Sequence, residues 1–73
     1  MSSMTNKEAK DYLATQVFAP DDLVINGKLW KLECTYLTRP EALASADFLS
    51  SYRLFRYPDG YALYERNYDT YED

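Results

Sequence analysis

The dipeptide Asn26-Gly27 constrains the fold of this chain more than any other feature. It lies between two short runs of β-forming residues, and both central positions of a two-residue hairpin turn need a positive φ, which Asn and Gly tolerate. Such a turn places Asp22 opposite Lys31, and the opposite charges favour that register. The sequence therefore predicts an antiparallel hairpin with the pairs Asp22–Lys31, Leu23–Trp30, Val24–Leu29 and Ile25–Lys28.

Alternation along this hairpin predicts which of its faces is buried. Side chains of successive residues in a strand point to opposite faces of the sheet. One set is more apolar than the other, and we predict it as the core face: Leu23, Ile25, Trp30, Leu32, Cys34 and Tyr36. The opposite face would carry Val24, Leu29, Lys31, Glu33, Thr35 and Leu37.

Two helices are predicted from their N-terminal signals. Thr5 and Glu8 have the spacing of a capping box, as do Thr38 and Glu41, where Pro40 falls in the first turn. Apolar residues recur at helical spacing after each box. These patterns predict helices over residues 6–17 and 39–50.

The segment Pro58-Asp59-Gly60 predicts a second hairpin between residues 52 and 66. Pro and Asp suit a type I turn, and a following glycine in the left-handed region completes a three-residue loop. That loop predicts the pairs Tyr57–Tyr61, Phe55–Leu63 and Arg53–Glu65 on one face, and Arg56–Ala62, Leu54–Tyr64 and Tyr52–Arg66 on the other.

The order of these elements predicts an α+β fold of two helix–hairpin units (αββαββ) with an antiparallel sheet. Neither hairpin is stable alone, so each must pack on a helix or on the other hairpin. With 73 residues the chain suits one compact domain, which we place at 1–68. Residues 69–73 are predicted to form an acidic, flexible C-terminal tail.

Composition argues against catalysis. The chain has no histidine, a single cysteine and only two glycines, both assigned to turns. A general base, a multi-cysteine metal site and a phosphate-binding glycine loop are therefore not expected. We predict no enzyme activity, no metal and no cofactor. No apolar run approaches the roughly 20 residues of a membrane span, and the start does not resemble a signal peptide, so a cytoplasmic protein is expected.

Tyrosine is the most over-represented residue, with eight copies, and five of them crowd the second hairpin and its exit beside arginines. Tyr and Arg are enriched at interface hot spots, although tyrosines also pack ordinary sheets. Net charge is −4, which disfavours nucleic acid as a direct partner. The predicted partner-binding residues are Arg53, Arg56, Tyr57, Asp59, Tyr61, Tyr64, Arg66, Asp69, Glu72 and Asp73.

The chain resembles the small RNA-polymerase-binding transcription regulator of a lytic Xanthomonas phage. Its length, its two helix–hairpin units, the tyrosine-rich segment 52–68 and the acidic end 68–73 carry the resemblance. We expect a monomer. The resemblance implies a protein that binds the N-terminal region of the host polymerase β′ subunit, displaces the σ factor and suppresses termination. It assigns no individual residues. Two alternatives stay open: another small phage inhibitor, such as an anti-CRISPR or nucleic-acid mimic, and a plain protein-interaction domain.

Overall fold

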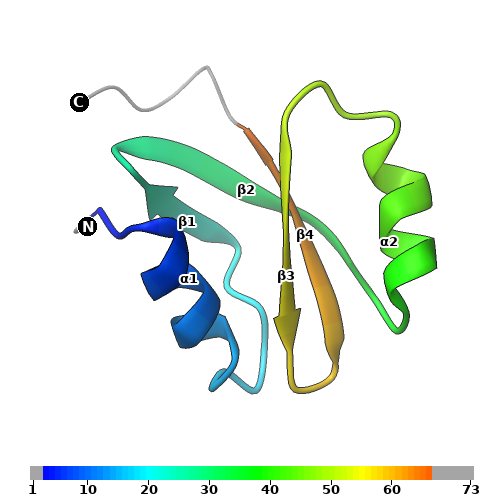
Figure 1. The fold of residues 1–73 in the computed structure, drawn as a ribbon, viewed down its shortest axis with the longest axis horizontal. Helices are drawn as coiled ribbons and strands as arrows, with labels where there is room; N and C mark the ends of the chain where they lie inside the picture. Colours follow the sequence, from blue (N-terminus) through cyan, green and yellow to red (C-terminus); the bar gives the residue numbers. More distant parts are fainter. Residues whose placement is uncertain (1–2, 67–73) are drawn as a thin grey trace.

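The computed structural model describes residues 3–66. Its strands form one antiparallel sheet in the order β1-β2-β4-β3, so β2 and β4 are central and β1 and β3 are edges (Figure 1). The predicted α+β class and antiparallel sheet are confirmed. The elements in chain order are α1 (Asn6–Leu13), β1 (Asp22–Ile25), β2 (Lys28–Tyr36), α2 (Arg39–Ala46), β3 (Tyr52–Tyr57) and β4 (Gly60–Arg66).

The first hairpin has the predicted turn and register. Asn26 and Gly27 have φ values of 52° and 77°, as a two-residue turn of this kind requires. All four predicted pairs are present. The Lys31 ammonium lies 3.4 Å from a carboxylate oxygen of Asp22 across the strands. Local turn chemistry was therefore sufficient to predict this hairpin.

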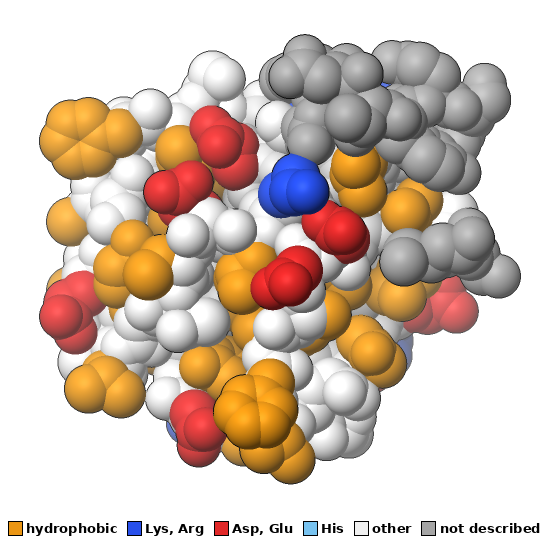
Figure 2. Space-filling model, turned by 180° about the vertical axis from the view of Figure 1, so that it is seen from behind, with side chains coloured by type: hydrophobic (Ala, Val, Ile, Leu, Met, Phe, Trp, Pro, Cys, Tyr) orange, Lys and Arg blue, Asp and Glu red, His pale blue; other side chains and the backbone are white. Residues whose placement is uncertain are grey.

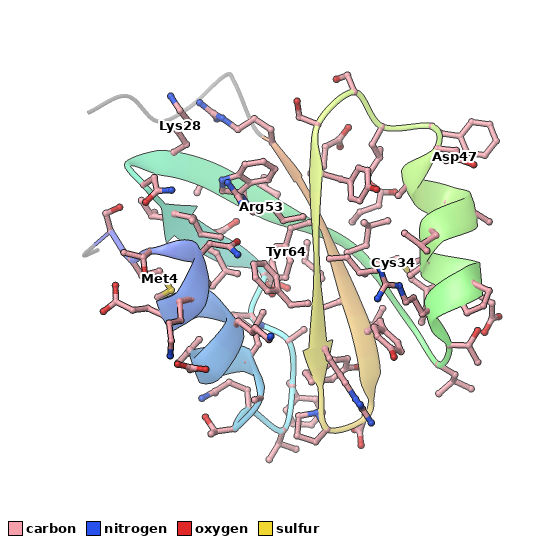
Figure 3. All side chains as sticks on the ribbon, viewed as in Figure 1. Met4, Lys28, Cys34, Asp47, Arg53 and Tyr64 are labelled. Atoms are coloured by element: carbon pink, nitrogen blue, oxygen red, sulfur yellow. The ribbon has the colours of Figure 1, made fainter. Side chains whose placement is uncertain are left out.

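The predicted core face of β2 is wrong beyond Leu32, because β2 contains a bulge. Leu32 and Cys34 pair with adjacent residues of β4, which leaves Glu33 as an extra residue. Every side chain after the bulge changes face. Cys34 is exposed and Tyr36 is half-buried, and both lie on the side of the sheet covered by α2 (Figure 3).

The predicted register of the second hairpin is also wrong. Its loop has two residues, and Gly60 belongs to β4, where it pairs with Tyr57. Each partner in β4 therefore shifts by one, which places Tyr57 and Tyr61 on opposite faces. The physical reason lies at Gly60, whose φ of 146° favours glycine and whose α-carbon lies against the Tyr36 carbonyl, leaving no room for a side chain.

The two helices pack on opposite faces of the sheet. Ala9 and Leu13 of α1 belong to the main core cluster, whereas Ala42 and Ala46 of α2 are buried outside it. On the α2 side, the Tyr36 hydroxyl donates to the Ser45 hydroxyl at 2.7 Å. Val24, predicted on the outer face, is also buried. The main cluster consists of Ala9, Leu13, Leu23, Ile25, Trp30, Phe55, Ala62 and Tyr64.

Both helices are shorter than predicted. The first capping box is present: the Glu8 amide donates to the Thr5 hydroxyl at 3.2 Å, and the Thr5 amide donates to the Glu8 carboxylate at 2.8 Å. The second box does not form, because the Thr38 hydroxyl donates to the Glu41 carboxylate and makes no hydrogen bond to the helix backbone. Since α1 ends at Leu13, Val17, the last residue of the predicted helix, lies outside it and is 67% exposed.

Candidate functional site

The outer edge of β3 carries unpaired backbone groups. The Arg66 amide donates to the Ser51 carbonyl at 3.2 Å, so the backbone of Ser51 faces β4. In an antiparallel ladder the direction alternates along the strand, which turns the N–H and C=O groups of Tyr52, Leu54 and Arg56 outward. Within residues 3–66, no backbone or side-chain hydrogen bond reaches these outward groups.

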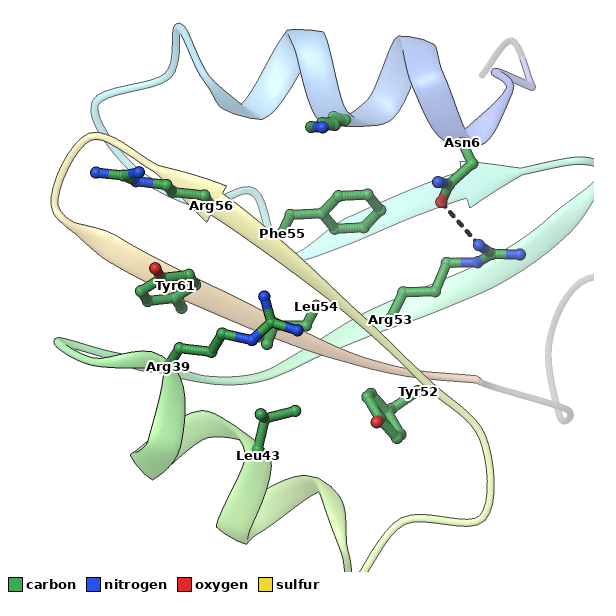
Figure 4. A pocket seen from close by; sticks show the side chains of 10 residues that line it. Asn6, Arg39, Leu43, Tyr52, Arg53, Leu54, Phe55, Arg56 and Tyr61 are labelled. Atoms are coloured by element: carbon green, nitrogen blue, oxygen red, sulfur yellow. Dashed lines mark hydrogen bonds between the residues drawn. The ribbon is translucent and has the colours of Figure 1, made fainter.

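A groove of about 750 Å³ runs along this edge, and we call it the β3 groove. One wall comes from α1 and the other from α2, with β3 between them (Figure 4). The helix α1 packs on β3 and β1, whereas α2 packs on β4 and β2, and each helix contributes residues to the groove. The lining residues are Asn6, Lys10, Arg39, Leu43, Tyr52, Arg53, Leu54, Phe55, Arg56 and Tyr61.

The β3 groove is cationic although the chain is acidic. Its lining contains four cations and no Asp or Glu. Outside this lining, residues 3–66 contain four further cations and nine acids, so the rest of the described structure is negative. Seen from behind, acidic side chains are spread over the surface and Lys and Arg are sparse (Figure 2). The charge is therefore sorted between two sides, and the groove favours an anionic ligand.

Arg53 is the most firmly held of these cations. Its guanidinium stacks on Trp30, 4.9 Å from the ring centroid, and donates to the Asn6 amide oxygen at 2.7 Å. Cation–π and hydrogen-bond contacts together fix its orientation between β3 and α1. Its Nε is buried and has no acceptor among the described residues. Arg53 thus shapes the α1 wall, while Lys10, Arg39 and Arg56 are exposed.

A second hollow of about 490 Å³ continues the groove towards the β3–β4 loop. The two hollows share Arg39, Arg56 and Tyr61. Tyr57 and Asp59 line only the second one. Since β3 has six residues, the combined depression follows an extended backbone of about 20 Å.

Five of the predicted binding residues lie along this depression. Arg53, Arg56 and Tyr61 line the β3 groove itself. Tyr57 and Asp59 stand at its loop end, and Tyr57 also packs against the core cluster. The structure therefore brings two of the three predicted arginines, Arg53 and Arg56, to one strand edge.

The prediction that Tyr64 binds a partner is wrong, because this residue is fully buried and cannot contact a partner. Its ring meets Phe55 edge-on, with the ring centroids 5.9 Å apart, and its hydroxyl donates to the Pro20 carbonyl at 2.7 Å. Burial raises the pKa of the Tyr64 phenol well above its ordinary value, and the negative charge of Asp21 adds to the shift. Tyr64 is a core residue with a satisfied hydroxyl.

The remaining predicted residues lie away from the groove or outside the described range. Arg66 is half-buried, and its guanidinium donates to the Leu29 carbonyl at 3.2 Å. Asp69, Glu72 and Asp73 fall outside residues 3–66, as does the predicted tail.

Sequence reasoning missed the residues that the helices contribute. Asn6 and Lys10 come from α1, and Arg39 and Leu43 come from α2. In the sequence they are ordinary helix residues, and the two pairs lie far apart along the chain. Only their helical spacing could have indicated a shared face for each pair. Tyr52 belonged to the noted tyrosine cluster without being selected.

The described residues offer little for chemistry. No group of three or more His, Cys, Asp or Glu side chains that could hold a metal occurs among residues 3–66. Cys34 is exposed, and its thiol donates to the Thr35 carbonyl at 3.4 Å. None of the helices in this range is both long and apolar enough to cross a membrane.

Comparison with protein-family models, with curated proteins and with solved structures finds no match for this chain.

Proposed function

We propose that this chain is a non-catalytic regulator that works in the cytoplasm of a bacterial host by binding RNA polymerase. In this proposal it occupies the N-terminal region of the β′ subunit, displaces the σ factor and suppresses termination. The β3 groove supports the binding half of the proposal, because it combines an open strand edge with four cations. The sequence resemblance supports the choice of partner.

The groove suits binding better than catalysis. Its polar residues are cations, an amide and two tyrosines, and it contains no carboxylate, thiol or imidazole. Such a set can position an anionic partner, but it contains none of the carboxylate or imidazole groups that usually act as a general base at neutral pH. Cations on both walls also suit a ligand that lies along the whole strand.

The sorted charge suits a large partner with both signs on its surface. The acidic side of the molecule would approach a basic part of the partner, while the groove holds an acidic segment. Complementary charges steer encounter and fix orientation more than they add affinity. Association should therefore slow as salt rises.

The test uses the tagged, intact chain with purified bacterial RNA polymerase. We expect retention of the isolated β′ N-terminal region and release of σ from the holoenzyme, measured by pull-down and promoter-dependent transcription. Lack of β′ binding would contradict the proposal. Capture of Cas or restriction subunits from lysate without polymerase would contradict it in favour of the anti-CRISPR or mimic alternative.

A charge-reversed variant connects this activity to the groove. Arg39→Glu combined with Arg56→Glu reverses two exposed cations, and the first of these changes places a carboxylate in the first turn of α2, where a negative charge is favourable. We expect this variant to lose most of the β′ binding. Lys28→Glu is the matched control, because Lys28 is exposed and lies outside the groove.

A further inference from the structure

We infer that the β3 groove binds an extended acidic polypeptide segment, which adds to the outer edge of β3 as a fifth strand. This inference rests on the proposed function in that the segment belongs to the regulated partner. It specifies the form of the ligand: a strand in which acidic residues alternate with apolar ones.

The backbone of β3 supplies the first argument. The outward N–H and C=O groups of Tyr52, Leu54 and Arg56 are spaced as in a sheet ladder, and they have no partner among the described residues. Addition of a strand to an exposed sheet edge satisfies such groups and provides affinity through main-chain hydrogen bonds. A ligand without a peptide backbone would leave these groups to water.

The two walls supply the second argument. Side chains of an added strand point alternately to the two faces of the sheet. On the α1 side they meet Lys10 and Arg53, a polar and cationic wall. On the α2 side they meet Leu43 and Tyr52, which add apolar surface beside Arg39 and Arg56. An alternation of acidic and apolar residues therefore matches the groove.

The charge of the groove argues against pairing with a second copy. Two β3 edges placed side by side would bring Arg53 and Arg56 of both copies together, and like charges on edge strands are a common defence against self-association. The same arginines attract an acidic strand. Nucleic acid would gain from the cations, but the outward amides would stay unpaired and the acids elsewhere would repel it.

The first experiment uses synthetic peptides and the intact chain, so it does not depend on polymerase. The probe is a fluorescently labelled, end-capped peptide of eight residues that alternates Glu and Val. We expect saturable binding, with none for an alternating Lys–Val peptide and much weaker binding for a peptide of four Glu followed by four Val. Equal binding of the two Glu–Val peptides would overturn the inferred strand.

Amide hydrogen exchange tests the backbone contact directly. With the Glu–Val peptide bound, exchange should slow at the outward amides of Leu54 and Arg56, and hardly change at the inward amide of Phe55. Uniform slowing along β3, or slowing confined to another strand, would contradict strand addition. This pattern separates pairing from simple charge attraction.

A pair of variants at position 56 separates the contribution of the cation to peptide affinity from that of the backbone N–H group. Arg56→Ala removes the charge, and we expect about fivefold weaker peptide binding. Arg56→Pro removes the charge and the outward donor, and proline is tolerated where the N–H of an edge strand faces solvent. We expect it to bind about tenfold more weakly again. Equal affinities for the two variants would overturn the backbone contact.

Two further measurements address the other occupants. Sedimentation of the free protein should show a monomer, and a dimer that Arg56→Pro dissolves would overturn the inference in favour of a second copy. Single-stranded oligonucleotide that binds more tightly than the Glu–Val peptide would overturn it in favour of nucleic acid. Peptide binding without polymerase capture would refute the proposed partner and leave this inference standing.

Discussion

The two edges of the sheet differ in how their backbone groups are paired. At β1, Met4 forms a parallel bridge with Ile25: its amide donates to the Val24 carbonyl at 3.0 Å, and its carbonyl accepts from Asn26 at 2.9 Å. The Ser3 hydroxyl accepts from the Gly27 amide at 2.6 Å. At β3, no segment among residues 3–66 pairs with the outer edge.

This difference shows where the chain leaves hydrogen-bonding capacity for a ligand. An open edge invites pairing with any exposed strand, so proteins cover their edges or place charges on them. The N-terminal segment covers the β1 edge, and arginines lie along the β3 edge. A covered edge cannot bind a partner, whereas a charged edge selects one of opposite sign.

The largest expected effect follows from removing the side chain that connects the two halves of the sheet. Trp30 pairs with Leu23 of β1 and stacks under Arg53 of β3, and it is 7% exposed. Trp30→Ala should lower the free energy of unfolding by about 3–5 kcal/mol in urea denaturation. Phe18→Ala is the control, because Phe18 is 81% exposed. Similar losses for both would contradict the described core.

The turn that positions β3 should be the next most sensitive place. Gly60→Ala forces a side chain into a backbone with φ of 146° and against the Tyr36 carbonyl. We expect a loss of more than about 2 kcal/mol. Asp59→Ala, in the exposed loop, should change stability by less than about 0.5 kcal/mol. An unchanged Gly60→Ala variant would contradict the described backbone at Gly60 and its close approach to the Tyr36 carbonyl.

Tyr64 connects β4 to the segment that leads into β1. Tyr64→Phe removes the hydrogen bond to Pro20 and should cost about 1–2 kcal/mol at neutral pH. The folded state holds the phenol proton more tightly than the unfolded state, whose pKa is about 10. The stability from Tyr64 is therefore complete below about pH 10 and is lost as pH rises above it. The difference in the free energy of unfolding between wild type and Tyr64→Phe should therefore shrink above about pH 10. A constant difference would contradict the raised pKa.

The covered edge can be opened at one residue. Met4→Pro removes the hydrogen bond to Val24, so it should cost about 1 kcal/mol more than Met4→Ala, which removes only the side chain. Faster amide exchange at Asn26 should accompany the loss. Arg56→Pro, at the β3 edge, removes no described hydrogen bond and should cost less than the difference between the two Met4 variants. A larger cost for Arg56→Pro than for that difference would contradict the assignment of β1 as the covered edge and β3 as the open edge.

The smallest effect concerns the helix ends that carry the groove walls. Thr5→Ala breaks a formed capping box and should cost about 1 kcal/mol. Thr38 makes no hydrogen bond to its helix backbone, so Thr38→Ala should cost less than about 0.5 kcal/mol. Thermal unfolding measures both. Equal costs would show that both caps act alike in solution.

Local signals were enough for the elements and for one hairpin. Asn26-Gly27 specified its own turn and register, and the box at Thr5 and Glu8 started α1 as predicted. These features depend on backbone torsions and on contacts between residues close in the chain. Sequence also predicted Arg53 and Arg56 as binding residues, and the structure places both in the lining of the groove.

Tertiary structure decided the register of the second hairpin, the β2 bulge and the location of the groove. Gly60 joined β4 because its α-carbon, which carries no side chain, lies beside the Tyr36 carbonyl. The extra residue Glu33 turned the side chains at the end of β2 to the face covered by α2. Lys10 and Arg39 line the same groove only because the helices cover opposite faces of the sheet. Pairing between distant segments set each of these outcomes. By itself the sequence therefore determined where hairpins and helices begin, and packing determined which sheet edge stayed open.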